Sequence, residues 1–123
     1  MQFLLDANSV ILALSGHPRL LHRLSQCDEG TLGVSAIVFA EVALGTARGK
    51  APSLAVLDAF LEEVVLLPFD EAAARTYATL PFKRGSYDHL IAAHALSLDL
   101  TLVTNNEDDF ADIPGLRTEN WTL

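Results

Sequence analysis

The sequence predicts an α/β fold: one domain with a mostly parallel central sheet and helices on both of its faces. Two observations lead to this expectation. Short apolar, β-prone runs recur along the chain, and helix-length segments rich in Ala and Leu separate them. Strands that alternate with helices indicate βαβ units, whose parallel strands lie in the middle of a sheet covered on both sides.

Four runs have the length and the apolar character of a strand buried on both faces: Phe3–Leu5, Thr31–Val34, Val64–Leu67 and Thr101–Val103. A last short strand is expected near Leu116–Thr118, because the turn signal Pro114-Gly115 comes just before it. These runs supply the strands of the predicted sheet.

Four segments are predicted to be helices: Ser35–Leu44, Leu54–Glu62, Asp70–Leu80 and Ser86–Leu98. We expect Ser35, Asp70 and Ser86 to cap three of them, because their side chains accept a hydrogen bond from the first turn. Gly45 is expected to end the first helix, since glycine tolerates the backbone conformation that follows a helix.

Length and composition favour one globular domain that spans residues 1–123. Half of the 123 residues are hydrophobic, one fifth are charged, and no repeat or linker interrupts them. The net charge of −8 excludes a broad basic surface for nucleic acid, but not a local patch. A single cysteine, Cys27, excludes an internal disulfide and a zinc ribbon. No signal peptide or membrane segment is evident, so we expect a cytoplasmic protein with no membrane partner.

Asp6 and Glu41 stand where an apolar pattern does not call for an acid. Asp6 follows Phe3–Leu5 directly, at the carboxyl end of the first strand, where open α/β sheets place their ligands. It could instead cap the following helix. Glu41 shares a helix face with Ile37, Val38 and Leu44, where a carboxylate costs several kcal/mol unless it is paired or metal-bound. The alternative is a helix edge at which Glu41 reaches water.

Asp88 is the third such acid, and a fourth group follows the strand Thr101–Val103. Asp88 lies in the first turn of its predicted helix, on the same face as the apolar Ile91, Ala92 and Ala95. The alternative is that Asp88 has no functional role, because acids are common in the first turn of a helix. The segment from residue 104 to residue 110 is a polar, acidic loop at a strand's carboxyl end; its acids could equally be a solvated helix start.

Carboxylates that share one cleft cannot all stay ionised without a cation, because like charges repel at short range. Oxygen ligands without cysteine or paired histidine suit Mg²⁺ or Mn²⁺ rather than Zn²⁺. His89 and His94 are five residues apart, so they do not form a zinc-binding pair on one helix face. A carboxylate-held Mg²⁺ most often acts on phosphates.

Four motifs, in order along the chain, resemble those of PIN-domain ribonucleases and in particular of VapC-type toxins. The opening F-L-L-D-A-N is similar to their hydrophobic run followed by D-T-N, with Ala7 in place of threonine. The second motif is S-A-I-V-F-A-E from Ser35 to Glu41, and the third is G-S-Y-D-H-L-I-A-A-H-A-L from Gly85 to Leu96. The fourth is L-V-T-N-N-E-D-D-F from Leu102 to Phe110, together with the closing segment from Gly115 to Trp121. The resemblance spans residues 3–121 and implies a single PIN-like domain.

The resemblance also implies roles for individual residues. The acids that match the family's catalytic, metal-binding acids are Asp6, Glu41 and Asp88. Asn106 falls where many members carry a fourth aspartate; it could bind through its carbonyl oxygen or a water, and Asp109 could supply the missing carboxylate. Asn8 and Thr104 match polar positions that bind water or orient the acids.

The implied function is that of a toxin in a toxin–antitoxin pair. Such a toxin is an endoribonuclease that uses Mg²⁺ or Mn²⁺ and an activated water to hydrolyse RNA phosphodiester bonds. The implied partners are an RNA substrate, a second copy in a homodimer, and a small antitoxin whose tail offers an Arg or Lys to the acids. The segments Arg48–Lys50 and Lys83-Arg84 could position RNA, or could be solubilising charges.

Other α/β proteins with clustered acids fit less well. A phosphoacceptor receiver domain needs a lysine after a late strand, and none follows Thr101–Val103. A phosphatase of the haloacid-dehalogenase type needs a second acid where Asn8 stands. A catalytically weak or inactive PIN-fold binding module remains open, because Asn106 replaces an acid. Neither the RNA target nor the number of metals follows from the sequence.

Overall fold

The computed structural model describes all 123 residues and contains one sheet of five parallel strands. The strands are β1 (Phe3–Leu5), β2 (Leu32–Ser35), β3 (Val65–Leu67), β4 (Thr101–Val103) and β5 (Thr118–Glu119). Their order across the sheet is β3-β2-β1-β4-β5. The predicted α/β architecture is therefore confirmed, with the last strand slightly later in the chain than expected.

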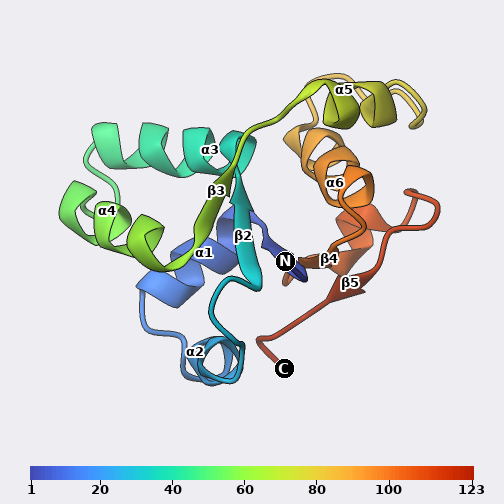
Figure 1. Cartoon of the computed structure of the whole chain (residues 1–123). Helices are drawn as coiled ribbons and strands as arrows, with labels where there is room; N and C mark the ends of the chain where they lie inside the picture. The colour runs from blue at the N-terminus through green and yellow to red at the C-terminus, as the bar shows by residue number, and fades with distance from the viewer.

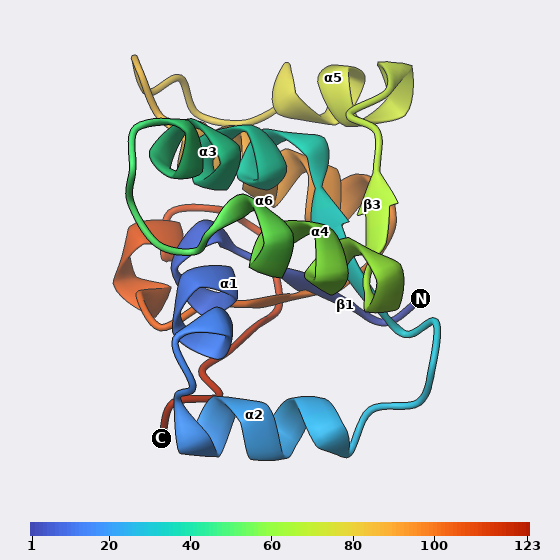
Figure 2. The same ribbon diagram turned by 90° about the vertical axis from the view of Figure 1, so that its left-hand side faces the viewer.

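The helices are α1 (Ala7–Leu14), α2 (Pro18–Ser25), α3 (Ala36–Ala47), α4 (Leu54–Glu63), α5 (Glu71–Tyr77) and α6 (Tyr87–Ser97), with a 3-10 helix, η1 (Glu107–Phe110). Figures 1 and 2 show α1, α3 and α4 on one face of the sheet and α6 on the other, with α5 packed against α6. Both faces are thus covered, as the apolar strands require. Every helix falls short of the length and apolarity that a bilayer span requires.

The sheet has a switch point between its first and fourth strands. Leu4 of β1 pairs with Gly33 of β2 on one side and with Leu102 of β4 on the other. The chain therefore adds strands first to one side of β1 and later to the other. In open α/β sheets a ligand site lies beyond the carboxyl ends of the strands at such a point. Here that place is bordered by Asp6 after β1 and Thr104 after β4.

The predicted caps are confirmed, and one predicted helix end is wrong. The side chains of Ser35, Asp70 and Ser86 accept backbone N–H groups of the helices that follow them. Helix α3, however, continues past Gly45 to Ala47. The left-handed backbone conformation that ends a helix occurs at Gly49, where φ is +82°.

Helix α2 and the exposure of β3 were not foreseen. Pro18 stands at the start of α2, and the ring of His17 caps it by accepting the Leu20 N–H at 3.3 Å, a role that histidine seldom has. Val65 and Leu66 are 41% and 42% exposed, because β3 is an edge strand that pairs only with β2. The expectation that every strand is buried on both faces is wrong for β3.

The C-terminal segment packs into the core beside β1. Trp121 is 1% exposed and meets Phe3 edge to face, with ring centroids 4.8 Å apart. Its indole N–H donates to the Glu119 carboxylate at 2.9 Å, so its polar atom is satisfied. The two ends of the chain are thereby held to the same sheet.

Candidate functional site

Asp6 lies at the carboxyl end of β1 and has two roles in the fold. Its side chain is nearly buried, and Oδ1 accepts the Ser9 backbone N–H at 2.8 Å, which caps α1. Its own backbone N–H donates to the Val103 carbonyl oxygen at 3.1 Å. The capping alternative is therefore correct, and it also fixes the orientation of the carboxylate at the switch point.

Ser9 links α1 to β4 beside Asp6, and this role was not predicted from the sequence. Its side chain is 2% exposed, and Oγ donates to the Val103 carbonyl oxygen at 3.0 Å. Ser9 stands three residues after the capping residue Asp6, and this spacing could have indicated that its side chain lies next to the cap. Asn8, which the resemblance singled out, is exposed on the outer side of the same turn.

Glu41 places a carboxylate oxygen inside the protein without a partner. Its Oε1 is fully buried and makes no hydrogen bond. Burial, and then the carboxylates of Asp88 and Asp6, raise the pKa of Glu41 above its ordinary value. On the predicted apolar face, Val38 is fully buried but Leu44 is 53% exposed, so that face is only partly inside. This partly buried acid, which two other acids act on, lacks compensating positive charge.

Asp88 is the third acid of this group. It lies in the first turn of α6, after the Ser86 cap. Burial, and then the carboxylates of Asp109 and Asp6, raise its pKa, while Lys83 and His89 oppose this change. The junction between β1 and α1 and the helices α3 and α6 therefore bring these acids to one edge of the sheet.

The loop after β4 contains a chain of hydrogen bonds that ends at Asp109. Thr104 is fully buried, and its Oγ1 accepts the Asn106 backbone N–H at 3.0 Å. The Asn106 side-chain amide then donates to a carboxylate oxygen of Asp109. Asn106 therefore turns its amide toward Asp109, and Asp109 is the exposed carboxylate of this loop that acts on Asp88.

The donor set fits a hard divalent cation. The side chains offer carboxylate oxygens, one of them without a hydrogen-bond partner, and the raised pKa values of Glu41 and Asp88 indicate uncompensated negative charge. As they stand, no three His, Cys, Asp or Glu side chains converge closely enough to ligate one ion directly. Mg²⁺ commonly binds through one or two carboxylates and several waters, so direct contact with all three acids is not required.

The two buried histidines have partners within the fold. Ser35 Oγ accepts the Ile37 N–H at 3.1 Å and shares a hydrogen bond with His94 Nδ1, 2.8 Å away. Burial lowers the pKa of His94, while Asp70 acts to raise it. This bond ties α6, which carries Asp88, to the start of α3, which carries Glu41. His89 contacts Ser86 at 3.0 Å and Asp112 at 3.2 Å.

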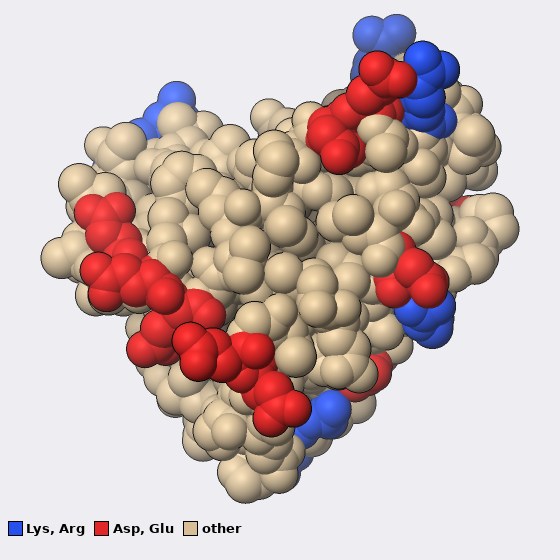
Figure 3. Space-filling model, viewed as in Figure 1, with Lys and Arg blue, Asp and Glu red and all other residues tan.

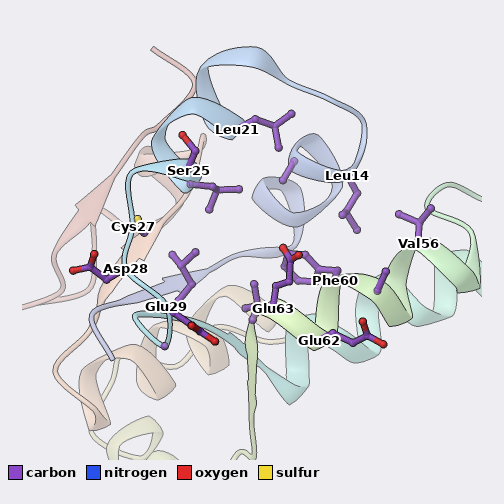
Figure 4. A pocket seen from close by; sticks show the side chains of 16 residues that line it. Leu14, Leu21, Ser25, Cys27, Asp28, Glu29, Val56, Phe60, Glu62 and Glu63 are labelled. Carbon is purple, nitrogen blue, oxygen red and sulfur yellow. The ribbon is translucent and has the colours of Figure 1, made fainter.

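An apolar groove lies apart from these acids, between α1, α2, α4 and the loop before β2 (Figure 4). Its volume is about 780 Å³, and ten of its sixteen lining residues are hydrophobic. The acids at its rim are Asp28, Glu29, Glu62 and Glu63. Figure 3 shows a band of acidic side chains across the lower left of the molecule, over the region that α4 and the segment before β2 occupy in Figure 1. This groove, called the α1–α2–α4 groove below, is lined mainly by hydrophobic side chains, and its acids do not form a cluster that could hold a metal ion.

Comparison with known proteins gives a consistent result over the whole chain. The model of the PIN domain family matches residues 3–116. A tRNA(fMet)-specific endonuclease VapC of Salmonella typhimurium is 33% identical over 130 residues, 98% of each chain. Ribonuclease VapC2 of Rickettsia felis is 32% identical, again over 98% of each chain.

Solved structures show the same fold. A chain in the DNA-bound VapBC structure from Salmonella typhimurium superimposes with a TM-score of 0.88 at 31% identity, and the match covers 98% of each chain. A chain in the Rickettsia felis VapBC2 structure, bound to a DNA fragment from its promoter, gives 0.83 at 31% identity, with 98% of this chain and 99% of that chain covered.

Proposed function

The chain belongs to the PIN domain family, and from this membership we propose that it is a divalent-metal-dependent endoribonuclease and the toxin of a toxin–antitoxin pair. Relatives that match it end to end are named ribonuclease VapC2 and tRNA(fMet)-specific endonuclease VapC. The observation that carries the proposal is the buried, unpartnered oxygen of Glu41 in the field of Asp6 and Asp88. Such a group is stabilised by a cation, and a carboxylate-held cation suits a phosphate substrate.

Mg²⁺ or Mn²⁺ is the proposed cofactor, held by Asp6, Glu41 and Asp88. When bound there, it would supply positive charge to the phosphate oxygens and make a water more acidic. Asp109 is proposed as the fourth ligand rather than Asn106, because the Asn106 amide already donates to it and supplies no charge of its own. Because RNA is the substrate, the cytoplasm is the expected place of action.

The remaining polar residues of the site keep these acids in place. Ser9 and the cap on α1 restrict Asp6 to one orientation at the switch point. Thr104 holds the backbone of Asn106, which in turn orients Asp109. Ionised carboxylates at this edge also repel the phosphates of RNA, so the chain alone should bind the scissile group weakly. Asn8 is proposed to orient solvent at the rim of the site.

The proposed protein partner is a small antitoxin. An Arg or Lys from its tail would compete with the cation for the three acids through charge-assisted hydrogen bonds. The α1–α2–α4 groove suits an apolar segment of the same partner, because Leu21 and Val56 are each 42% exposed and the rim is acidic. Both surfaces thus favour a partner that carries positive charge. A homodimer is also proposed.

Cleavage of RNA tests the enzymatic proposal. A single-stranded RNA should be cut in Mg²⁺ or Mn²⁺ and not in excess EDTA, and Asp88→Asn should abolish the cut. Asp58→Asn, an exposed change of the same charge on α4, is the matched control and should retain activity. Cleavage in EDTA, or full activity of Asp88→Asn, would contradict the proposal. A folded protein that never cleaves RNA would indicate a binding module instead.

Expression tests the partner. The chain expressed alone should arrest growth, and co-expression with the adjacent small reading frame should relieve the arrest. Leu21→Glu places a charge in the groove and should weaken this relief without changing RNA cleavage, because the groove is apart from the acids. A harmless chain without a binding neighbour would contradict the antitoxin proposal and leave the nuclease proposal standing.

A further inference from the structure

The segment that joins α5 to α6, together with the first residue of α6, exposes two large aromatic side chains. Phe82 is 80% exposed and Tyr87 is 58% exposed. Among the large apolar side chains only the C-terminal Leu123, at 82%, is more exposed than Phe82. Packing within the chain therefore does not account for an aromatic residue at position 82, because burial is what makes such a side chain stabilising.

Two cations lie between these aromatic residues in the sequence. Lys83 and Arg84 are exposed, and neither takes part in an ion pair. Three other arginines are neutralised by acids: Arg23 by Glu119, Arg75 by Glu71 and Arg117 by Asp99. Arg19, Arg48 and Lys50 are unpaired as well, so what distinguishes Lys83 and Arg84 is that they are adjacent and lie in the segment that leads to Asp88.

The same segment leads directly to the proposed active site. It ends at the Ser86 cap of α6, and Asp88 follows in the first turn. Lys83 and Arg84 stand five and four positions before Asp88. A hollow of about 240 Å³, lined by Tyr77, Gly85, Ser86, Tyr87 and Leu90, lies beside it. This is smaller than the roughly 300–1,000 Å³ of small-molecule pockets, so the surface suits a strand that crosses it.

We propose that residues 82–87 bind single-stranded RNA next to the scissile phosphate, with bases stacked on Phe82 and Tyr87 and phosphates against Lys83 and Arg84. The assignment rests on the proposed ribonuclease function. Aromatic rings accept the face of any base, and a duplex hides those faces, so the surface selects single strands without reading a sequence. The cations offset the repulsion between RNA and the carboxylates nearby.

Binding is measured in EDTA, where the proposed cleavage does not occur. The probe is a fluorescein-labelled ten-residue oligouridine, followed by anisotropy. Because base stacking contributes about 1–3 kcal/mol per base, Phe82→Ala should raise Kd about five-fold or more. Phe82→Tyr keeps the ring and should bind like the wild type. Leu123→Ala removes an equally exposed apolar side chain far along the chain and should change nothing.

The salt dependence of Kd tests the cations separately. Each phosphate contact on a single strand contributes about 0.7 to the slope of log K against log salt concentration. Lys83→Gln with Arg84→Gln should therefore reduce that slope by about 1.4. Arg19→Gln, an exposed change on α2, is the control and should leave the slope unaltered.

Unchanged Kd and slope in these variants would overturn the inference, as would equal binding of a duplex of the same length. Conversion of a dimer to a monomer by Phe82→Ala would overturn it too, because a second copy would then cover Phe82. The nuclease proposal is judged independently. Loop-dependent binding without cleavage would support this inference alone, whereas metal-dependent cleavage with an unchanged KM in the loop variants would support only the nuclease.

Discussion

Replacing Glu41 by glutamine should stabilise the metal-free protein. The substitution keeps the size of the side chain and removes a charge that burial, Asp88 and Asp6 all disfavour. Removing one disfavoured surface-accessible charge of this kind is worth about 1 kcal/mol. For a chain of 123 residues, that corresponds to a rise in Tm of roughly 3–6 °C in EDTA at pH 7.

The pH dependence of this gain has a fixed sign. The pKa of Glu41 is raised in the folded state, so its ionisation destabilises the fold as pH rises above its ordinary pKa of about 4.5. The wild type therefore regains stability as pH falls and the carboxyl group takes up a proton. The difference in Tm between Glu41→Gln and the wild type should shrink from pH 7 toward pH 4.5.

Saturating Mg²⁺ should reverse the order of stability. A ligand present at 100 times its Kd stabilises the folded state by about 2.7 kcal/mol, and only the wild type retains the full set of acids. Thermal unfolding in EDTA and in Mg²⁺, followed by circular dichroism, gives both numbers. Glu62→Gln, an exposed change of the same charge on α4, is the control and should shift neither midpoint appreciably. Equal midpoints for Glu41→Gln and the wild type under both conditions would refute the reasoning.

Three further results are expected. Asp109→Ala should weaken Mn²⁺ binding, measured by calorimetry, more than Asn106→Ala does; the opposite order would make the amide the ligand. His94→Gln should reduce the loss of stability that the wild type shows below pH 6.5. The pKa of His94 is lowered in the folded state, so protonation of His94 favours the unfolded state as pH falls. Denaturant unfolding at pH 5 and pH 7.5 measures the free energy of unfolding of both proteins. Trp121→Ala should cost about 3–5 kcal/mol in urea unfolding, since Trp121 is fully buried against Phe3.

The sequence predicted the strands and capped helices well because each carries a local signal. An apolar run of the right length identifies β1 or β4, and the serine before Tyr87 identifies the start of α6. Helix α2 lacked such a signal, because a histidine ring caps it. The end of α3 was misplaced because two glycines, Gly45 and Gly49, could each have ended it, and only the three-dimensional structure shows which has a positive φ.

The candidate acids could be named from the sequence because each conflicts with its local pattern. Their mutual influence could not, since Asp6, Glu41 and Asp88 come from elements far apart in the chain. The same reason hid Ser9, whose partner is a backbone carbonyl. Every residue has a backbone carbonyl group, so the identity of Val103 does not indicate that its oxygen accepts hydrogen bonds from Asp6 and Ser9.

That carbonyl has a consequence for synthesis of the chain on the ribosome. The Val103 oxygen receives both the Asp6 N–H and the Ser9 hydroxyl, the latter across 94 positions of sequence. β1 also lies between β2 and β4, so the growing chain lacks one neighbour of its first strand until residue 103 has been added. For most of translation, Asp6 and Ser9 in the nascent chain therefore lack their hydrogen bonds to β4. If the site around Asp6 is harmful to the cell once these bonds form, the hazard arises only when the polypeptide is nearly complete and close to release.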